Sequence, residues 1–296
     1  IEDIARQNST ITDIKLTSYL NTLYGIARYI SNNQINIPET VKDFRKIISK
    51  EEFNGLGFVS TDGIVLSTNG IDEIQFSISD RSYWQTLLQK QHVITEVYFS
   101  TITHKRIFFV AVPVLDENKN FKGAIHASIL VSDFQNYIGK KLGLSNYNVF
   151  LIDKQGEYVT KCNRKNAQSY ENFFDFFTDH GRKLNIEELK ANIQIEKTFT
   201  KDVYIDKEDY IACFTPLEQN NWYTVVTISQ NDIHKQVSKL VDYNLYILIA
   251  KLLIAFGFLS VLITYITRKE EIKQRNQEIQ VQEKLFSDID GIVQAD

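Results

Sequence analysis

The sequence contains no methionine, and only 3 prolines and 2 cysteines, in 296 residues. Because not even an initiator methionine is present, we expect a fragment or a processed form of a longer chain. Scarce proline, together with 19 phenylalanines and 15 tyrosines, argues against disordered linkers and predicts packed helices and sheets. A net charge of −4 offers no basic surface for nucleic acid, so we expect no nucleic-acid partner.

Residues that carry chemistry are scattered rather than clustered. Cys162 and Cys213 fit no metal-ligand spacing, and they form either a disulfide or, as we favour, two small buried side chains. Four histidines share no metal spacing: His92, His104, His180 and His234. No phosphate loop, nucleophile elbow or catalytic acid pair is present, since Asp175 and Asp179 stand in the aromatic run NFFDFFTDH, which predicts core packing. We therefore expect no enzyme activity, no metal and no cofactor.

One long apolar stretch, YNLYILIAKLLIAFGFLSVLITYI, runs from Tyr243 to Ile266 with Lys251 as its only charge. A bilayer core of about 30 Å needs about 20 apolar residues in a helix, so this stretch is long enough. Tyrosines stand near both ends, as interfacial aromatics do, and Lys251 can snorkel to the first end. The stretch predicts a transmembrane helix over 243–266. The alternative is a buried core helix, although such helices seldom stay apolar on every face.

The charges beside this stretch predict its orientation. Basic residues follow it closely at Arg268, Lys269, Lys273 and Arg275, whereas only Lys235 and Lys239 precede it closely. The positive-inside rule then places residues 1–242 outside the cell membrane and the residues after the span in the cytoplasm. Because no signal peptide is present to export residues 1–242, we expect a second span upstream of residue 1.

The opening segment carries a helical stripe. Its apolar residues are spaced by fours and threes, which is typical of one face of an amphipathic helix: Leu16, Leu20, Leu23, Ala27 and Ile30. We expect residues 1–36 to form a long helix against which other elements pack.

Residues 53–235 carry one pattern twice. GLGFVSTDGIVLST and YNVFLIDKQGEYVTK each predict a β-hairpin around a tight turn. Further on, FFVAVPVLDENKNFKGAIHASILVSDF and YIACFTPLEQNNWYTVVTISQNDI each predict two strands, with Pro113 or Pro216 near the end of the first strand. A helix then begins at 132–133 or 231–232, where Ser-Asp and Asn-Asp are typical N-caps. The recurrence favours duplication of an α/β unit over chance similarity between hairpins.

The order of GIARYI, SDRSYWQTLL, VYFSTIT, IFFVAVPV and FKGAIHASI makes residues 1–238 resemble the double Cache (dCache) sensor modules of bacterial transmembrane receptors. The resemblance implies an α+β fold with a stalk helix (1–36) and two tandem PAS-like modules. The membrane-distal module (37–142) would bind a small organic ligand, and the membrane-proximal module (143–242) would precede the span. A cytoplasmic signalling helix (267–296) and a homodimer complete the expected arrangement.

In the amino-acid-binding branch of this family, aromatic residues, an arginine and an aspartate form the ligand site. The matching positions of this sequence are Phe76, Arg81, Tyr83, Trp84, Tyr98 and Ser128. Position 128 departs from the pattern, because a serine can accept a hydrogen bond but supplies no counter-charge for a ligand ammonium group. A carboxylate without an amine is therefore more compatible with this site than an α-amino acid.

The residue types support the same site independently. Arg81 offers a planar fork that matches a carboxylate, and the aromatics at 83, 84 and 98 offer flat walls with polar tips. His126 and Ser128 alternate on a predicted strand, so they share a face. Asp80 leaves an alternative open, since it either pairs with Arg81 or caps a helix that begins at Ser82.

After the apolar stretch, apolar residues recur every seven positions at Ile272, Ile279, Phe286 and Val293. This weak seam fits a helix that changes its packing during signalling, and it fits a plain solvated helix equally well. We expect the sensor region of a signalling receptor whose output domain, by preference a diguanylate cyclase or a histidine kinase, lies outside this sequence. The alternatives are a chemoreceptor sensor region and a membrane-anchored extracellular enzyme. The sequence does not specify the ligand, the output domain or the oligomeric state.

Overall fold

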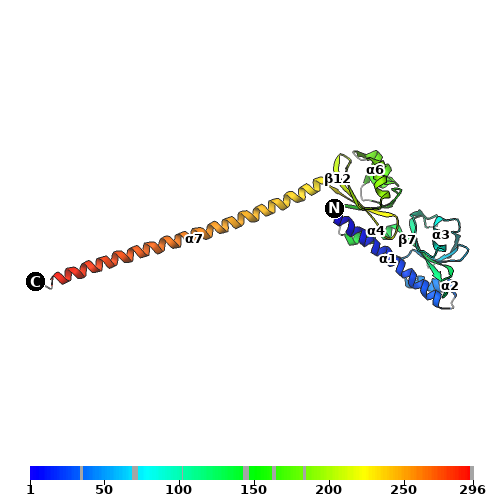
Figure 1. Ribbon diagram of the computed structural model, residues 1–296, viewed down its shortest axis with the longest axis horizontal. Helices are drawn as coiled ribbons and strands as arrows, with labels where there is room; N and C mark the ends of the chain where they lie inside the picture. The colour runs from blue at the N-terminus through cyan, green and yellow to red at the C-terminus, as the bar shows by residue number, and fades with distance from the viewer. Residues whose placement is uncertain are drawn as a thin grey trace. The chain divides into compact units, whose positions relative to one another are not determined.

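The computed structural model describes residues 1–33, 36–68, 73–101, 103–142, 147–161, 165–182 and 185–293. The chain divides into two compact units, Ile1–Ile233 and His234–Asp296. Its helices, drawn in Figure 1, are α1 (Glu2–Asn32), α2 (Ile37–Ile47), α3 (Ser82–Leu88), α4 (Val131–Leu142), η1 (Lys165–Ser169, a 3-10 helix), α5 (Phe173–His180), α6 (Ile186–Gln194) and α7 (Gln230–Val293).

The first sheet is antiparallel and has the strand order β3-β2-β1-β7-β6-β4, with β5 also pairing with β6. Its strands are β1 (Gly55–Val59), β2 (Ile64–Thr68), β3 (Glu73–Ser77), β4 (Val93–Ile94), β5 (Tyr98–Phe99), β6 (Arg106–Leu115) and β7 (Phe121–Leu130). The predicted hairpin over residues 55–68 is confirmed, since Val59 pairs with Val65 across its turn. The hairpin of β6 and β7 is the longest pairing of this sheet and lies between β1 on one side and β4 and β5 on the other.

The second sheet is also antiparallel, in the order β10-β11-β12-β13-β8-β9. Its strands are β8 (Asn148–Asp153), β9 (Tyr158–Thr160), β10 (Gly181–Arg182), β11 (Phe199–Ile205), β12 (Glu208–Pro216) and β13 (Trp222–Ser229). The second predicted hairpin is therefore present as β8 and β9. The neighbours β9-β8-β13-β12 repeat the arrangement β2-β1-β7-β6 of the first sheet, which is the spatial form of the repeated sequence pattern.

Helix α1 packs along both sheets of its unit (Figure 1). The predicted apolar stripe is confirmed, because all five of its residues are buried in one core cluster. That cluster also contains Phe108 of β6, Ile125 of β7 and Trp222 of β13, so one helix face joins residues of the two sheets. Burial of each leucine of the stripe contributes about 1.5–3 kcal/mol, which makes this face a main source of stability for the unit.

Two polar contacts reinforce this packing. The Lys15 ammonium lies 2.7 Å from a Glu52 carboxylate oxygen and 4.4 Å from the centroid of the Tyr19 ring. The pair joins α1 to the segment before β1, and the aromatic face adds a cation–π contact to a largely buried charge. Between the sheets, the Arg106 guanidinium donates a hydrogen bond to the backbone carbonyl of Tyr158.

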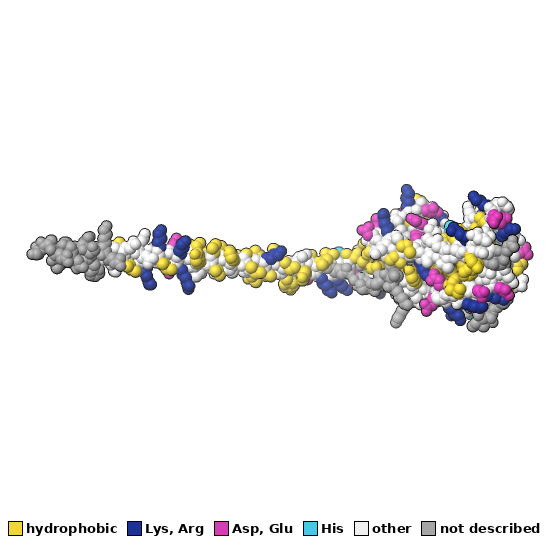
Figure 2. Space-filling model, turned by 90° about the horizontal axis from the view of Figure 1, so that it is seen from below, with side chains coloured by type: hydrophobic (Ala, Val, Ile, Leu, Met, Phe, Trp, Pro, Cys, Tyr) yellow, Lys and Arg dark blue, Asp and Glu magenta, His cyan; other side chains and the backbone are white. Residues whose placement is uncertain are grey.

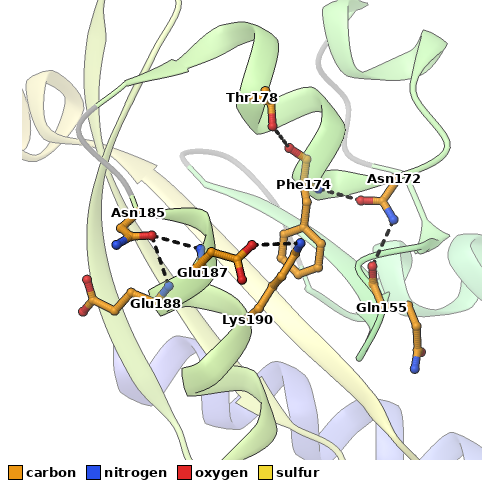
Figure 3. A network of polar contacts seen from close by, with 8 residues as sticks. All are labelled: Gln155, Asn172, Phe174, Thr178, Asn185, Glu187, Glu188 and Lys190. Atoms are coloured by element: carbon orange, nitrogen blue, oxygen red, sulfur yellow. Dashed lines mark hydrogen bonds and ion pairs between the residues drawn. The ribbon is translucent and has the colours of Figure 1, made fainter.

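Asparagine side chains cap the helices that cover the second sheet (Figure 3). Asn172 accepts a hydrogen bond of 2.8 Å from the N–H of Phe174, and Asn185 accepts one of 3.0 Å from the N–H of Glu187. Such caps satisfy N–H groups that the first helical turn leaves without partners. The aromatic run of α5 is buried against this sheet as predicted, through Phe173, Phe174, Phe176 and Phe177.

The starts of two helices differ from the predicted positions. Helix α4 begins at Val131 and α7 begins at Gln230, each slightly earlier than the expected caps at 132–133 and 231–232. Asp133 and Asp232 therefore lie in the first helical turn. Their negative charges interact favourably with the helix dipole there, so an acidic signal in the sequence marks the first turn as well as the cap.

The structure describes one of the two cysteines, Cys213. Cys213 in β12 is free and fully buried, as the interpretation of a small buried side chain predicts. Burial raises the pKa of its thiol. Cys162 lies outside the described residues.

Helix α7 runs without a break through the apolar stretch at 243–266. Among the residues that the structure describes, it is the one helix long and apolar enough to cross a membrane, with a mean hydropathy of 2.5 in its most apolar window. None of that window is buried by other parts of the chain, unlike a core helix. Figure 2 shows this stretch in yellow, with dark blue basic side chains following it. Ile272 and Ile279 are exposed, and the side chains of Phe286 and Val293 lie outside those described.

Gly123 in β7 supplies a first testable prediction. Its φ of +136° disfavours side chains, and a Cβ there would overlap the Phe58 ring and the Val59 carbonyl. We expect Gly123→Ala to destabilise the first unit by about 1–3 kcal/mol. Urea unfolding of the whole chain in detergent, followed by tryptophan fluorescence, measures this, because both tryptophans (Trp84 and Trp222) belong to that unit.

Gly139→Ala is the matched control. Gly139 lies within α4, and a Cβ there would meet no atom within 4 Å. Alanine favours a helix over glycine by about 1 kcal/mol, so this variant should be as stable as the parent or more stable. Equal unfolding midpoints for Gly123→Ala and the parent would contradict the described backbone of β7.

Candidate ligand-binding site

A cavity of about 470 Å³ lies on the first sheet, on the face turned away from α1. The alternation of β6 and β7 produces the two faces, because successive side chains of a strand point to opposite sides. Phe108 and Ile125 point into the core shared with α1. Phe109 and His126, their neighbours along the chain, line the cavity.

The cavity brings together six of the seven predicted site residues, which are Phe76, Arg81, Tyr83, Tyr98, His126 and Ser128. Trp84, the seventh, does not line the cavity: it is buried in a core cluster, with its ring at 70° to the Phe121 ring and 5.8 Å from it. Consecutive residues of an α-helix point about 100° apart, so Tyr83 and Trp84 of α3 cannot share one wall. Phe76 and Tyr83, which line the cavity, pack against the same cluster, so Trp84 supports the cavity wall from behind.

Arg81 stands at the rim of the cavity. It is the N-cap residue of α3 in extended conformation, and its side chain is 56% exposed. The Asp80 carboxylate lies 3.9 Å from its Nε and is 79% exposed, so of the two alternatives for Asp80 the structure has a loose ion pair. No side-chain cap is present at this helix start. An exposed pair of this kind contributes little, about 0–1 kcal/mol, and a ligand carboxylate can compete with it.

The floor of the cavity consists of His126 and Ser128, both buried in β7. Their partners across the β1 pairing are Gly57 and Gly55. A Cβ at Gly57 would come within 2.5 Å of His126 Nε2, so glycine leaves the space that the imidazole occupies. The imidazole lies against Phe109 at 5.4 Å between ring centroids, and its Nε2 has no hydrogen-bond partner among the described residues.

Burial shifts the pKa values of three side chains in the cavity wall, His126, Tyr83 and Tyr98. It lowers the pKa of His126 to about 4, so the imidazole is neutral at pH 7. It also raises the pKa of Tyr83 to about 12 and raises that of Tyr98. The positive charge of Arg81 opposes the rise in both tyrosines, which means that the guanidinium lies near both phenols.

Further lining residues were not predicted from the sequence. They are Asn54, Gly55, Ser67, Ser77, Ile78, Phe99, Ser100, Thr101, Thr103, Ile107 and Phe109. Strand alternation would have identified Ile107 and Phe109, which share a face of β6. Thr103 lies between β5 and β6, where no periodicity marks it, yet its buried hydroxyl also lacks a partner among the described residues.

The residues of this wall suit the binding of a small molecule. It offers one guanidinium, neutral hydroxyl and amide groups, and aromatic faces, which suits a small anionic ligand with an apolar body. Within the described ranges, no group of three or more His, Cys, Asp and Glu side chains is placed to hold a metal ion.

Comparison with known proteins finds similarity to a kinase and to the ligand-binding domains of chemoreceptors. Over 110 residues, which are 35% of this chain and 22% of the relative, the chain is 30% identical to sporulation kinase D of Bacillus subtilis. The ligand-binding domain of the Pseudomonas fluorescens chemoreceptor CtaA, solved with L-serine, aligns with a TM-score of 0.60 at 14% identity, over 78% of this chain and 96% of that one. That of the Pseudomonas aeruginosa chemoreceptor PctB, solved with L-Arg, aligns with a TM-score of 0.58 at 14% identity, over 78% and 94% of the two chains.

These structural likenesses show a shared fold at low sequence identity. The family relationship comes from the sequence itself, since the model of the Cache domain (dCache) matches residues 1–237. The match covers the long helix α1, both sheets and the cavity. The chain therefore belongs to the double Cache family of ligand-binding sensor domains.

Proposed function

We propose that this chain is the extracytoplasmic sensor region of a bacterial transmembrane signalling receptor, and that a small organic carboxylate is its ligand. One observation carries the proposal: Arg81 stands at the rim of a cavity whose buried floor is neutral. A guanidinium holds a carboxylate through two parallel hydrogen bonds, and the aromatic walls accept an apolar body. Phe76, Tyr83, Tyr98, His126 and Ser128 are the proposed ligand-contacting residues beside the arginine.

The proposed layout follows the sequence of elements. Residues 1–36 form the stalk, 37–142 the membrane-distal PAS-like module with the ligand site, and 143–242 the membrane-proximal PAS-like module. The repeated strand order of the two sheets supports two related modules. Residues 243–266 cross the membrane, which the exposed apolar surface of α7 supports, and residues 267–296 lie in the cytoplasm, where α7 continues to Val293.

Signal transfer would use the direct junction of β13 and α7. Ser229 ends the strand and Gln230 begins the helix, so no flexible loop separates the second sheet from the proposed span. A ligand shifts a two-state equilibrium only if it binds the two states with different affinity. Closure of the cavity around the ligand would supply that difference, and two copies pairing along their helices would transmit it as a homodimer.

The likeness to sporulation kinase D supports a histidine kinase as the output domain, although it covers 22% of that protein. A diguanylate cyclase fits the same sensor region equally well. A chemoreceptor is the second candidate, because the sensor domains of CtaA and PctB share this fold. The sequence of the gene beyond the codon for residue 296 distinguishes a histidine kinase, a diguanylate cyclase and a chemoreceptor as the output.

Arg81→Ala tests the ligand site. An acid that binds the parent at about 100 times its Kd should stabilise the first unit by about 2.7 kcal/mol and raise its melting temperature by roughly 5–10 °C. Removal of the charged bidentate contact should weaken binding about 10- to 100-fold. The measurement is a thermal-shift screen of the whole chain in detergent against organic acids, followed by tryptophan fluorescence.

Arg28→Ala provides the control, since Arg28 is an exposed arginine of α1 outside the cavity. Both unliganded variants should melt close to the parent, as exposed substitutions usually do. A melting temperature far below the parent for Arg81→Ala alone would make the arginine structural, and an undiminished ligand shift would remove it from the site.

The pKa of His126 predicts how binding depends on pH. Because burial lowers this pKa to about 4, the imidazole takes up a proton only as the pH falls through about 4. The charge of the wall is then constant from about pH 5.5 to 8, and the Kd of an acid already ionised there should not change. Calorimetric titrations across this range test it. A transition centred near about pH 6.5, the value of an ordinary imidazole, would contradict a buried neutral His126.

Cysteine labelling tests the proposed topology. In a background with Cys162 and Cys213 replaced by alanine, Lys207→Cys places an exposed thiol in the first unit and Gln282→Cys places one after the apolar stretch. A membrane-impermeant maleimide added to intact cells in which an outer membrane has been made permeable should label position 207 and spare position 282. Equal labelling of both positions would contradict a span at 243–266, and labelling of 282 alone would contradict the proposed orientation.

A further inference from the structure

The formal charge of the cavity wall is of one sign, positive. Among the described residues that line it, Arg81 carries the only formal charge at pH 7, and His126 is neutral. Asp80 is outside the lining and points into solvent beside Arg81. Glu96 lies in a separate cleft of about 360 Å³ that shares Tyr83 and Tyr98 with the cavity as a common wall. No described carboxylate therefore faces the ligand space.

The buried end of the cavity is built from neutral hydrogen-bonding groups. Ser128 is 7% exposed, and its Oγ lies 3.5 Å from the amide Nδ2 of Asn54. Nearby, His126 Nε2 and Thr103 Oγ1 are buried with no partner among the described residues, so a bound molecule can supply hydrogen bonds that these groups lack. These groups match a neutral hydroxyl, carbonyl or apolar surface, and they provide no compensating negative charge.

An ammonium group would be poorly accommodated in such a cavity. A cation transferred from water to a buried position costs free energy unless an opposite charge pairs with it. When the ligand carboxylate pairs with Arg81, an amine on the adjacent carbon that points into the cavity has only neutral partners among the described lining residues. The guanidinium also repels a second positive charge within the same small space.

We propose that this cavity selects carboxylates that lack an α-amino group, and that the lack of an acidic side chain at position 128, which Ser128 occupies, determines this specificity. The inference rests on the proposed function of the cavity as a carboxylate site. It sets this chain apart from CtaA and PctB, whose solved complexes contain L-serine and L-Arg. The ligand class is a monocarboxylate with a branched or aromatic body, in keeping with walls formed by Phe76, Phe109 and Ile107.

Matched ligand pairs test the selection without any change to the protein. L-Leucine and 4-methylpentanoate differ only in the amine, as do L-phenylalanine and 3-phenylpropanoate. We expect the amine-free member of a pair to bind the whole chain in detergent about tenfold or more tightly than its amino acid, a difference typical of one unpaired buried group. Thermal shift at a series of concentrations, followed by calorimetry, measures the ratio.

Two substitutions then test the role of position 128. Ser128→Asp places a carboxylate beside the Asn54 amide and should reverse the preference, so that the amino acid binds more tightly than its amine-free partner. Ser128→Ala removes only the hydroxyl and should keep the preference of the parent. If Ser128→Asp does not fold, the matched pairs on the parent chain still decide the selection.

The outcomes separate this inference from the proposed function. An amino acid that binds the parent as tightly as its amine-free partner, with binding lost in Arg81→Ala, overturns the selection and leaves the carboxylate site standing. A preference that stays unchanged in a folded Ser128→Asp chain removes position 128 as the determinant of the selection. If no member of either pair binds through Arg81, both the carboxylate site and the selection fail.

Discussion

The structure depends on the alternation of side chains along the β6–β7 hairpin. One set of residues, which includes Phe108, Val110 and Ile125, packs into the core that α1 shares with the sheets. The other set, which includes Phe109 and His126, faces the cavity. Because the side-chain period of a strand is two, a shift of the register by one residue would move the core set to the cavity and the cavity set to the core. The stability of the first unit and the composition of its ligand site therefore have one common cause.

The same hairpin explains why a polar floor is tolerated in a buried place. The His126 ring lies near the rings of Phe76 and Phe109, at centroid distances of 6.1 and 5.4 Å. It stays neutral because a charged imidazole would lose its hydration there. Arg81, by contrast, keeps its charge at the rim, where half of its side chain meets water. The cavity thus separates a charged entrance from a neutral interior, and this separation favours an anionic group with an apolar body.

Much of this arrangement is predictable from sequence where a period or a turn signal exists. The stripe of α1, the four hairpins and the shared face of His126 and Ser128 all follow from periodicity. The position of Trp84 does not follow from it. The resemblance places both Tyr83 and Trp84 in the ligand site, whereas the helical turn of α3 directs their two side chains to different sides. Thr103 lies between β5 and β6 and Asn54 lies between α2 and β1, and only the tertiary fold brings these two residues to the cavity. The short strands β4 and β5 carry no pattern of their own and depend on pairing with β6.

A crystal structure of the first unit with a bound organic acid, such as 4-methylpentanoate, tests the central claim most directly. The account predicts both carboxylate oxygens at about 2.7–2.9 Å from the Arg81 guanidinium nitrogens, with the apolar body lying over Phe109 on the face of the sheet opposite α1. An acid bound elsewhere, or one inside the cavity with its carboxylate turned away from Arg81, would contradict it.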